Sequence, residues 1–424
     1  RQGGVLSVML YALLMDEIAK EVERKELGIK IPGTNQVVGC LLWMDDVVLM
    51  HNTPEGLQEL LNITYKFAKK YHIEFGKEKS KVMIIGKKKS KEKFNLGDMD
   101  MERTDKYKYL GEILNETNKL GDQVIEARRK AEAAYQTILA VAGSEDLKGI
   151  ELESIWKLIE TCIKPAITYS SETWDPRKQD IKKLNGILDN IIKRVLLTPV
   201  TTPRESLYIE TGLLDIEHTI DIKKILAQNR LERTKNVLLE NILKTTRPNC
   251  WRERIQRTNE QYTVILIKNL RKGEAKRLTN ELVNEKQRER MIDIAQNPNK
   301  PKKKVKYLLE GLVDPFNTEM PMYLRKLGRM EASLLFRARN RMLKIKNNFR
   351  GKYQSLVCRG CGVSEETQEH VLEECEGIHL NNNTKLAKEQ LFNLERVSIC
   401  KEVCRRLKYI MSKIEQNENS IQVY

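Results

Sequence analysis

The segment CLLWMDDVVLM, from Cys40 to Met50, places two adjacent aspartates inside an apolar run. The residues at 37–43 and 47–50 are apolar and rich in β-branched side chains, as is typical of strands. Only three residues separate the two runs, and two of them are Asp45 and Asp46. We therefore predict a β-hairpin with both acids at its tip. Adjacent residues of a strand point to opposite faces, so the two carboxylates cannot face one cleft equally.

Two neighbouring carboxylates in an apolar setting indicate a cation site. Mg²⁺ (or Mn²⁺) is a hard ion that binds through one or two carboxylates together with the phosphates of a substrate. Two such ions can stabilise the attacking and leaving oxygens of a phosphoryl transfer. The dipeptide Asp45-Asp46 is also an ordinary polar turn, so the acids alone leave both interpretations open.

The residues around the hairpin predict an α+β arrangement up to about residue 115. Gly4–Arg24 is expected to form a helix whose beginning is apolar nearly all round, and such helices are buried. Thr53 is expected to cap a helix with Pro54 in its first turn, and apolar residues at helical spacing follow as far as Tyr71. Further strands are predicted at Ile73–Phe75, at Lys81–Ile85 and within Lys106–Leu114, where the strand ends near Gly111.

Beyond residue 115 the apolar pattern becomes helical. Helices are predicted at Asp122–Val141, Leu152–Tyr169, Leu184–Leu197, within Ile216–Leu243 and at Met330–Ile345. Asn297–Lys306 is predicted to be a basic linker. Its segment Pro301–Lys306 resembles a short nuclear import signal, which predicts nuclear localisation at least in part, although a flexible basic linker has the same composition.

The excess of basic residues predicts an acidic partner. The chain has 75 Lys and Arg against 59 Asp and Glu, for a net charge of +16, and phosphate backbones are the main candidate. Arg337, Arg341 and Lys344 alternate with Phe336 and Phe349, so cations there can meet phosphates while rings stack on bases. A solvated helix face with its aromatic side chains in the core has the same pattern. No apolar run approaches the roughly 20 residues that cross a membrane.

A cluster of cysteines and one histidine predicts a second metal site. Cys358, Cys361, His370 and Cys375 have the spacing Cys-x2-Cys-x8-His-x4-Cys. Three thiolates and an imidazole are a tetrahedral ligand set for structural Zn²⁺, and incidental buried thiols are the alternative. Ser364 is expected to cap a short helix that carries His370. Five residues of α-helix separate two side chains by about 140°, so we expect the helix to end or unwind before Cys375.

Four segments occur in an order that carries more weight than any one of them. They are RQGGVLSVMLYALLMDEI (Arg1–Ile18), LLWMDDVVLM (Leu41–Met50), IEFGKEKSKVMII (Ile73–Ile85) and YKYLGEIL (Tyr107–Leu114). This succession resembles the reverse transcriptase family, in particular its non-LTR retrotransposon branch. The Cys3His spacing is also similar to the C-terminal zinc knuckle of those proteins.

The resemblance implies an α+β fold with part of a polymerase right-hand palm, an antiparallel sheet with helices, followed by a mainly helical thumb and C-terminal region. The implied domains are a palm that lacks its N-terminal part (1–115), a helical thumb (116–215), a helical linker region with the basic segment (216–329), a basic helix with the zinc knuckle (330–380) and a helical tail (381–424).

The resemblance also implies an RNA-directed DNA polymerase that uses an RNA template, a DNA primer or target and dNTPs. Asp45 and Asp46 would hold Mg²⁺. Contacts to nucleotide or nucleic acid are implied at Gln2, Gly3, Lys79, Lys81 and the primer-grip residues Tyr109, Leu110 and Gly111. The family completes its metal site with an aspartate from an earlier palm strand, so we expect this chain to be a fragment that is inactive alone.

Two other hypotheses stay open. The family has Tyr or Phe and then a small residue before its two acids, whereas this chain has Trp43 and Met44. That departure fits a zinc- and nucleic-acid-binding remnant without catalysis. An organellar intron maturase would share the polymerase motifs, but the knuckle spacing and the import-like segment count against it. The oligomeric state is left open.

Overall fold

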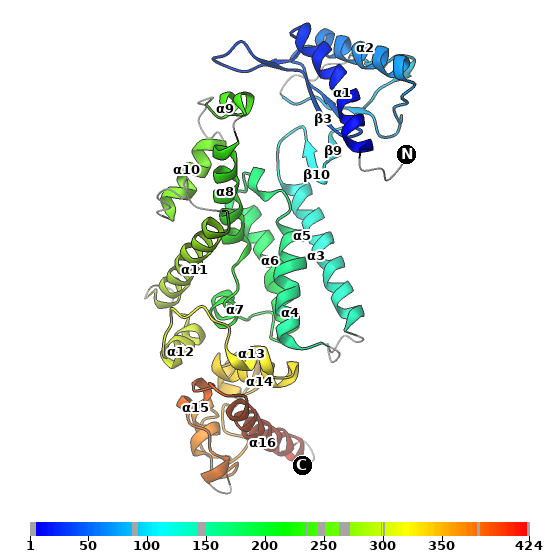
Figure 1. Ribbon diagram of the computed structural model, residues 1–424. Helices are drawn as coiled ribbons and strands as arrows, with labels where there is room; N and C mark the ends of the chain where they lie inside the picture. The colour runs from blue at the N-terminus through cyan, green and yellow to red at the C-terminus, as the bar shows by residue number, and fades with distance from the viewer. Residues whose placement is uncertain are drawn as a thin grey trace. The chain divides into compact units, whose positions relative to one another are not determined.

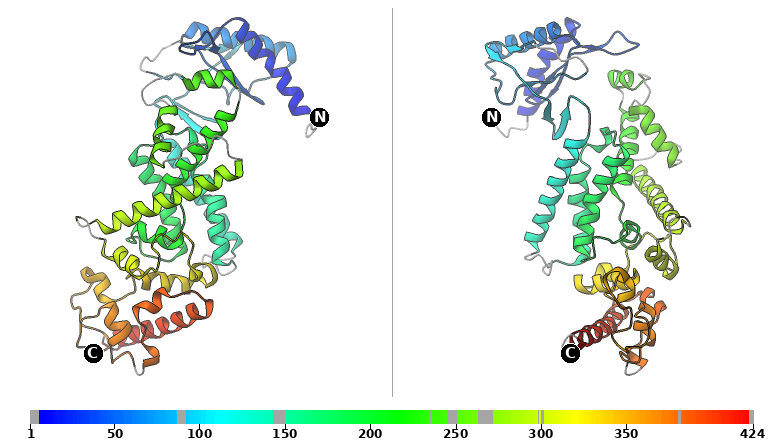
Figure 2. Two further views of the ribbon diagram at one scale, coloured as in Figure 1. Left: turned by 60° about the vertical axis from the view of Figure 1, so that its left-hand side comes forward. Right: turned by 180° about the vertical axis from the view of Figure 1, so that it is seen from behind.

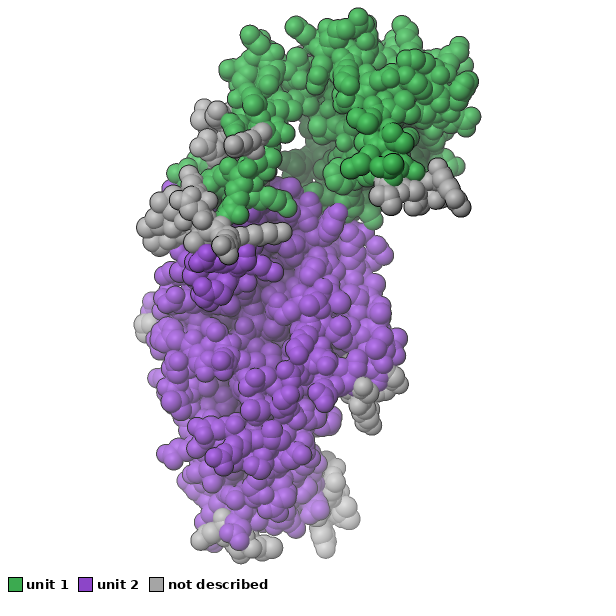
Figure 3. Space-filling model, viewed as in Figure 1, with its two compact units in different colours: residues 1–123, 228–257 green, residues 124–227, 258–424 purple. Residues whose placement is uncertain are grey.

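The computed structural model describes residues 6–86, 92–142, 150–234, 236–244, 251–262, 272–297, 299, 302–379 and 382–421. The chain divides into two compact units, which Figure 3 colours separately. Unit 1 contains Arg1–Gln123 and Gln228–Arg257, and unit 2 contains Val124–Ala227 and Thr258–Tyr424. Within the described ranges, no helix has both the length and the apolar composition needed to cross a membrane.

Unit 1 combines two long helices with short strands. Helix α1 (Ser7–Arg24) packs against α2 (Pro54–Tyr71) and against the strand β3, as Figures 1 and 2 show. Thr53 caps α2 as predicted, because its hydroxyl accepts a hydrogen bond from the Gly56 backbone N–H at 3.2 Å. The strands are β1 (Ile29–Lys30), β2 (Val37–Val38), β3 (Cys40–Trp43), β4 (Asp46–Leu49), β5 (Lys81–Val82), β6 (Asn95–Leu96), β7 (Met99–Asp100), β8 (Glu102–Arg103), β9 (Lys106–Tyr109) and β10 (Glu112–Asn115).

The described strands pair two by two and do not join into one sheet. The pairs β1–β2, β3–β4, β6–β7 and β9–β10 are antiparallel, and β5–β8 is parallel. Helices with small, mainly antiparallel sheets agree with the predicted α+β class. The main core of unit 1 lies between α1, α2 and the β3–β4 hairpin and contains Met15, Ile18, Val22, Leu60, Ile63 and Phe67.

Two local predictions for unit 1 were wrong. The beginning of α1 is not buried, since Met9, Leu10 and Leu13 are between 63 and 67 % exposed. Only the opposite face of the helix reaches the core, through Tyr11, Leu14 and Met15. The strand expected at Ile73–Phe75 is irregular, and the one expected at Lys81–Ile85 is limited to the two residues of β5.

The described part of unit 2 is mainly helical. The helices that lie wholly or partly in unit 2 are α3 (Gly121–Val141), α4 (Leu152–Leu158), α5 (Lys164–Ile167), α6 (Lys178–Val195), α7 (Arg204–Thr211), α8 (Ile216–Arg233), α10 (Trp251–Gln261), α11 (Lys272–Gln296), α12 (Lys303–Gly311), α13 (Met322–Lys326), α14 (Arg329–Arg339), α15 (Lys388–Phe392) and α16 (Val397–Ile421). Helix α9 (Val237–Lys244) belongs to unit 1. The short helical turns are η1 (Ile159–Ile163), η2 (Ser171–Thr173), η4 (Lys346–Lys352), η5 (His370–Glu374) and η6 (Asn382–Thr384).

A buried ion pair joins four helices of unit 2. Arg339 of α14 lies 2.8 Å from Glu210 of α7, and both side chains are almost fully buried. The Tyr323 hydroxyl of α13 donates to the same carboxylate at 3.0 Å, and Arg339 donates to the Leu391 carbonyl of α15 at 2.9 Å. Because every charged partner is hydrogen-bonded, the pair is tolerable in a low-dielectric interior.

Candidate active site and metal centre

The two adjacent acids lie at the turn of the β3–β4 hairpin. The register pairs Trp43 with Asp46 and Leu42 with Val47, which leaves Met44 and Asp45 as a two-residue turn. Met44 has the positive φ of 54° that such tight hairpin turns require. The hairpin prediction is therefore confirmed, with Asp46 as the first residue of β4 rather than part of the turn.

The faces of the hairpin explain why the acids are tolerated. Leu42 and Val47 pack against the α1–α2 core, whereas Trp43 and its partner Asp46 share the opposite face. Trp43 is 60 % exposed, and the side chains of Asp45 and Asp46 are exposed as well. Water screens their mutual repulsion, so the acids are tolerated although their flanks are apolar.

A second hairpin carries the predicted primer-grip residues. Residues 106–115 form β9 and β10 around a turn at Leu110 and Gly111, whose φ angles are 46° and 82°. The predicted strand that ends near Gly111 is β9, whereas the second strand of the hairpin, β10, was not predicted. Burial raises the pKa of Tyr109, and the negative charge of Asp46 raises it further. The phenol of Tyr109 thus lies within electrostatic reach of the second acid.

The two candidate lysines differ in availability. Lys79 is exposed, and its backbone carbonyl accepts a hydrogen bond from the Tyr107 hydroxyl at 2.8 Å. The ammonium of Lys81 forms an ion pair with Glu102 on the adjacent strand β8. The predicted contacts Gln2 and Gly3 lie outside the described residues.

The structure brings the four predicted zinc ligands together in unit 2. The ligand atoms of Cys358, Cys361, His370 and Cys375 all lie within 4.8 Å of one another. The Sγ atoms of Cys358 and Cys375 are 3.6 Å apart, and Cys361 Sγ is 3.3 Å from His370 Nε2. Three sulfur donors and one imidazole nitrogen form a closed set of the kind that suits Zn²⁺.

Backbone geometry shapes the turn that carries the first two cysteines. Val357 and Glu365 form an antiparallel bridge, and the Cys358 N–H donates to the Ser364 carbonyl at 2.7 Å. Gly360 sits at the tightest point, because a Cβ there would lie 2.8 Å from Cys375 Sγ. The sequence between the two cysteines therefore allows the thiols to approach one another.

A widened helical turn presents the other two ligands. Residues 370–374 form the π-helical turn η5, and the Cys375 N–H donates to the His370 carbonyl at 2.8 Å. This i→i+5 bond brings Cys375 back over His370, which an α-helical turn would not do. The expectation that the helix unwinds before Cys375 is confirmed in this form. The cap is Thr367 rather than Ser364, since its hydroxyl accepts from the His370 N–H at 3.1 Å.

The protonation of the thiols shows what a cation contributes. Burial and the neighbouring thiols Cys358 and Cys361 raise the pKa of Cys375 to about 12. Burial also acts to raise the pKa of Cys361, but backbone hydrogen bonds from Ser364 and Val363 and the contact with His370 outweigh it and lower the pKa to about 6. Crowded thiolates repel one another, and a bound divalent cation removes that repulsion. The donor set therefore fits zinc.

A buried ion pair connects this cluster to the basic residues at 337–352, which precede it in the sequence. Arg359 lies between the first two cysteines, and its guanidinium contacts the Glu366 carboxylate at 2.6 Å. Arg359 also donates to the Lys344 carbonyl at 2.8 Å, and Glu366 accepts from the Lys346 N–H at 2.8 Å. Arg359 was not among the predicted functional residues; its position between two candidate metal ligands was the available signal.

The basic residues at 337–352 are only partly available for binding. Arg337 donates to the Leu197 carbonyl, and Arg341 pairs with Glu369 and lies 4.4 Å from the centre of the Tyr307 ring. Lys344 is exposed. Phe336, one of the aromatic side chains of this segment, is fully buried in the core.

Comparisons with known proteins agree with the order of the motifs. Residues 1–114 match the family described as reverse transcriptase (RNA-dependent DNA polymerase). A putative uncharacterized transposon-derived protein of Caenorhabditis elegans is 23 % identical over 240 residues, which are 54 % of this chain and 84 % of that protein. The retrovirus-related Pol polyprotein from a type-2 retrotransposable element of Drosophila melanogaster is 32 % identical over 121 residues, which are 26 % of this chain and 11 % of that protein. The chain therefore carries a reverse transcriptase domain at residues 1–114 and is related to the proteins of non-LTR retrotransposons.

Proposed function

We propose that this chain contributes to RNA-directed DNA synthesis, with Asp45 and Asp46 as ligands of Mg²⁺ or Mn²⁺. The observation that carries the proposal is the hairpin that exposes both carboxylates at one end, with the phenol of Tyr109 within electrostatic reach of Asp46. Two exposed carboxylates fit a hard cation that takes its remaining ligands from water and substrate phosphates. When bound, such ions neutralise charge on a transferring phosphoryl group.

The chain's own residues then position the substrates. The turn at Leu110 and Gly111 is proposed to seat the end of the DNA primer beside the acids, and Lys79 to contact phosphate. Lys81 is a weaker candidate, because its ammonium is already paired with Glu102. Gln2 and Gly3 stay predictions from the family resemblance.

Metal binding and nucleotide incorporation by the same variants test this proposal. We expect Mn²⁺ binding, followed by electron paramagnetic resonance in the presence of an RNA template, a DNA primer and dNTP, to be lost in Asp45→Asn and Asp46→Asn. Asp98→Asn is the matched control, since Asp98 is an exposed acid of the same unit. Any primer extension by the unaltered chain should likewise be lost when Asp45 or Asp46 is replaced. Extension that persists in the Asp45→Asn, Asp46→Asn double variant would contradict the assignment.

A second candidate function is nucleic-acid binding without catalysis. The compact Cys3His cluster favours it, because that site is complete within this chain whereas the acids are only two exposed carboxylates. In this case the chain binds zinc and RNA or DNA, but neither binds Mn²⁺ through Asp45 and Asp46 nor incorporates nucleotides.

We also propose that Cys358, Cys361, His370 and Cys375 hold one structural Zn²⁺. The four donors form a closed shell, so no ligand position is left for water and the site orders the chain rather than catalysing a reaction. One zinc per chain is expected by atomic absorption, and the Cys358→Ser, Cys375→Ser double variant should lose it. Cys162→Ser is the control, because Cys162 is exposed and lies outside the cluster.

A further inference from the structure

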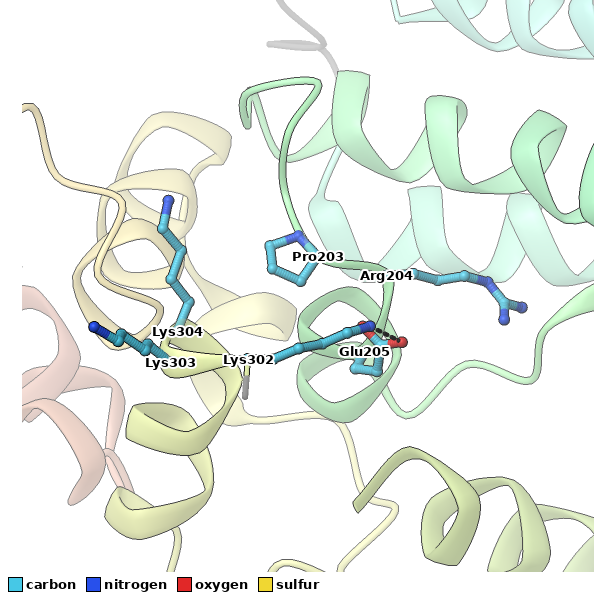
Figure 4. Close-up of a pocket in the computed structure, with 6 residues that line it drawn as sticks. All are labelled: Pro203, Arg204, Glu205, Lys302, Lys303 and Lys304. Atoms are coloured by element: carbon cyan, nitrogen blue, oxygen red, sulfur yellow. Dashed lines mark ion pairs between the residues drawn. The ribbon is translucent and has the colours of Figure 1, made fainter. Parts of the chain in front are cut away.

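A hollow of about 480 Å³ lies in unit 2 between the beginnings of α7 and α12. Figure 4 shows its lining, which consists of Pro203, Arg204, Glu205, Lys302, Lys303 and Lys304. Four of these six side chains are basic and one is acidic. The lysines belong to the segment that resembles an import signal, of which Pro301 lies outside the described residues.

Helix α12 holds the lysines in place, so the prediction that the basic linker extends to Lys306 was wrong beyond Lys302. Lys302 is the N-cap residue of α12, Lys303 and Lys304 form its first turn, and Val305 is fully buried. The N-terminal end of a helix is its positive end, where cationic side chains are unfavourable and anions are favourable. No side chain caps α12. The sequence thus concentrates positive charge where the helix itself disfavours it, and an anion in the hollow would offset that cost.

The one acidic side chain of the hollow does not neutralise this charge. Glu205 forms an ion pair with Lys302 at 2.7 Å (Figure 4). The hollow therefore has no second carboxylate that could pair with Lys303 or Lys304. For these two lysines, the described part of the chain provides no ion pair, and Lys303 is exposed. Burial alone lowers the pKa of Lys304, so no carboxylate compensates for it.

An aromatic ring lies next to Lys304. The Lys304 ammonium is 5.1 Å from the centre of the Phe349 ring, and the Lys352 ammonium is 5.7 Å from the same ring. Phe349 interrupts the helical turn η4 with φ −136° and ψ 43°, so its backbone departs from the segment around it. Cations beside an aromatic side chain are the combination with which proteins bind single-stranded nucleic acids.

We propose that the hollow binds a phosphate of the phosphodiester backbone of single-stranded nucleic acid through Lys303 and Lys304. A volume of about 480 Å³ admits one nucleotide and is within the ordinary range of small-ligand sites. Phe349 holds Lys304 at the hollow and offers a surface for a neighbouring base. The inference rests on the proposed function in one respect, that nucleic acid is the partner of this chain.

Fluorescence anisotropy with the full chain tests the assignment. The probes are a labelled single-stranded RNA of about 15 nucleotides, the DNA of the same sequence and the DNA duplex, each titrated over a range of salt concentrations. The test variant is Lys303→Gln, Lys304→Gln. The control variant, Lys306→Gln, Lys276→Gln, removes the same charge from two exposed lysines that do not line the hollow. Lys302 is left unchanged, because its loss would strand the buried Glu205.

We expect the test variant to bind both single strands about five- to tenfold more weakly than the control does, with a salt dependence reduced by about one unit per lysine. RNA and DNA should lose affinity alike, because the backbone phosphate is common to both. A loss confined to RNA would overturn the backbone assignment, and an equal loss for the duplex would overturn the preference for single strands.

Three further outcomes separate this inference from the proposed function. If the test and control variants bind alike while the unaltered chain binds RNA tightly, the hollow is not the site and the proposed function stands. If inorganic phosphate raises the unfolding temperature of the chain through Lys303 and Lys304 while RNA affinity is unaffected by their substitution, the hollow is a small-anion site. If the unaltered chain binds none of the probes, the nucleic-acid partner itself is excluded.

Discussion

Gly360 shows how a single residue limits the approach of the four proposed zinc ligands. A Cβ at this position would lie 2.8 Å from Cys375 Sγ and 2.6 Å from Ile378 Cγ1, distances that force one of these groups to move. Gly360→Ala is therefore expected to weaken zinc binding by about 10- to 100-fold, the range seen when residues that support metal ligands are changed. Competition with a chromogenic chelator measures the affinity.

Gly351→Ala is the control for this prediction, because a Cβ at Gly351 would meet nothing within 4 Å. Both glycines lie in the segment that precedes the last two ligands, so a general effect on the flexibility of this region should appear in both variants. Equal zinc affinities for the two variants would contradict the close-approach argument.

The buried pair of Arg339 and Glu210 makes a prediction about stability. Arg339→Ala removes the cation and leaves the Glu210 carboxylate buried with only neutral donors. Breaking one partner of a buried pair costs about 3–5 kcal/mol, because the remaining charge cannot be solvated. Urea unfolding followed by circular dichroism should show this loss in the free energy of unfolding.

An exposed arginine provides the comparison. Arg405 on α16 pairs with Glu402 at 2.9 Å, but its side chain is 74 % exposed. Water and salt screen such pairs, so Arg405→Ala should leave the free energy of unfolding nearly unchanged. If the two variants lose similar stability, burial is not what makes the Arg339 pair important.

At the scale of elements, the beginning of α8 is held by a charged cap that predicts pH dependence. The Asp215 carboxylate accepts from the His218 N–H at 2.9 Å, lies 2.6 Å from the His218 ring and pairs with Arg204. Burial acts to raise the pKa of Asp215, but His218 and Arg204 outweigh it and hold the pKa well below its usual range. The contribution to stability is therefore present above the unfolded pKa of about 3.9 and is lost as the pH falls below it.

Urea unfolding of the unaltered chain and of Asp215→Asn at several pH values measures this contribution. The difference in the free energy of unfolding between the two proteins should be largest near neutral pH and shrink as the pH is lowered below about 4. Asp293→Asn, a change of an exposed acid on α11, should show no such trend. A difference that is constant with pH would mean that the Asp215 charge does not stabilise the cap.

Elements with a clear apolar period could be predicted from the sequence. The periodic segments at 122–141 and 152–167 are helical in the structure, and the β3–β4 hairpin follows from its two apolar runs. The hairpin at 106–115 was not predicted, because its turn requires a positive φ at Leu110, which a leucine rarely adopts. The 25-residue helix α11 was missed because charged residues obscure its period.

The candidate sites that lie within one short segment could also be predicted, whereas those that combine distant segments could not. Spacing was enough to predict that the four candidate zinc ligands lie together, because all four belong to one short segment and depend on local turns. The partners of Arg337 and Arg341 could not be predicted, since Leu197 is 140 residues distant in sequence and Tyr307 belongs to another helix. The basic hollow was missed for the same reason: it combines Pro203–Glu205 with Lys302–Lys304, and only folding brings these segments together.

At the scale of the whole molecule, the two units have separate cores and separate candidate chemistry. The acids and Tyr109 belong to unit 1, whose core forms around Ile18 and Leu60. The Cys3His cluster and the basic hollow belong to unit 2. Cores of this kind can unfold as distinct cooperative steps, so a single free energy of unfolding need not describe the whole chain. Experiments on the acids and on the cluster can therefore be interpreted separately.

Removal of zinc should distinguish the units. A ligand that binds only the folded state stabilises the part that binds it, so a chelator should lower the unfolding temperature of the transition that includes unit 2. The transition of unit 1 should stay in place, because its core contains none of the four ligands. Differential scanning calorimetry with and without chelator, with fluorescence of Trp43 in unit 1 as a local probe, makes the measurement. The other three tryptophans, Trp156, Trp174 and Trp251, are replaced by Phe for the fluorescence experiment. A chelator that shifts the Trp43 signal as far as the main calorimetric transition would show that the two units unfold together and that zinc stabilises the whole chain.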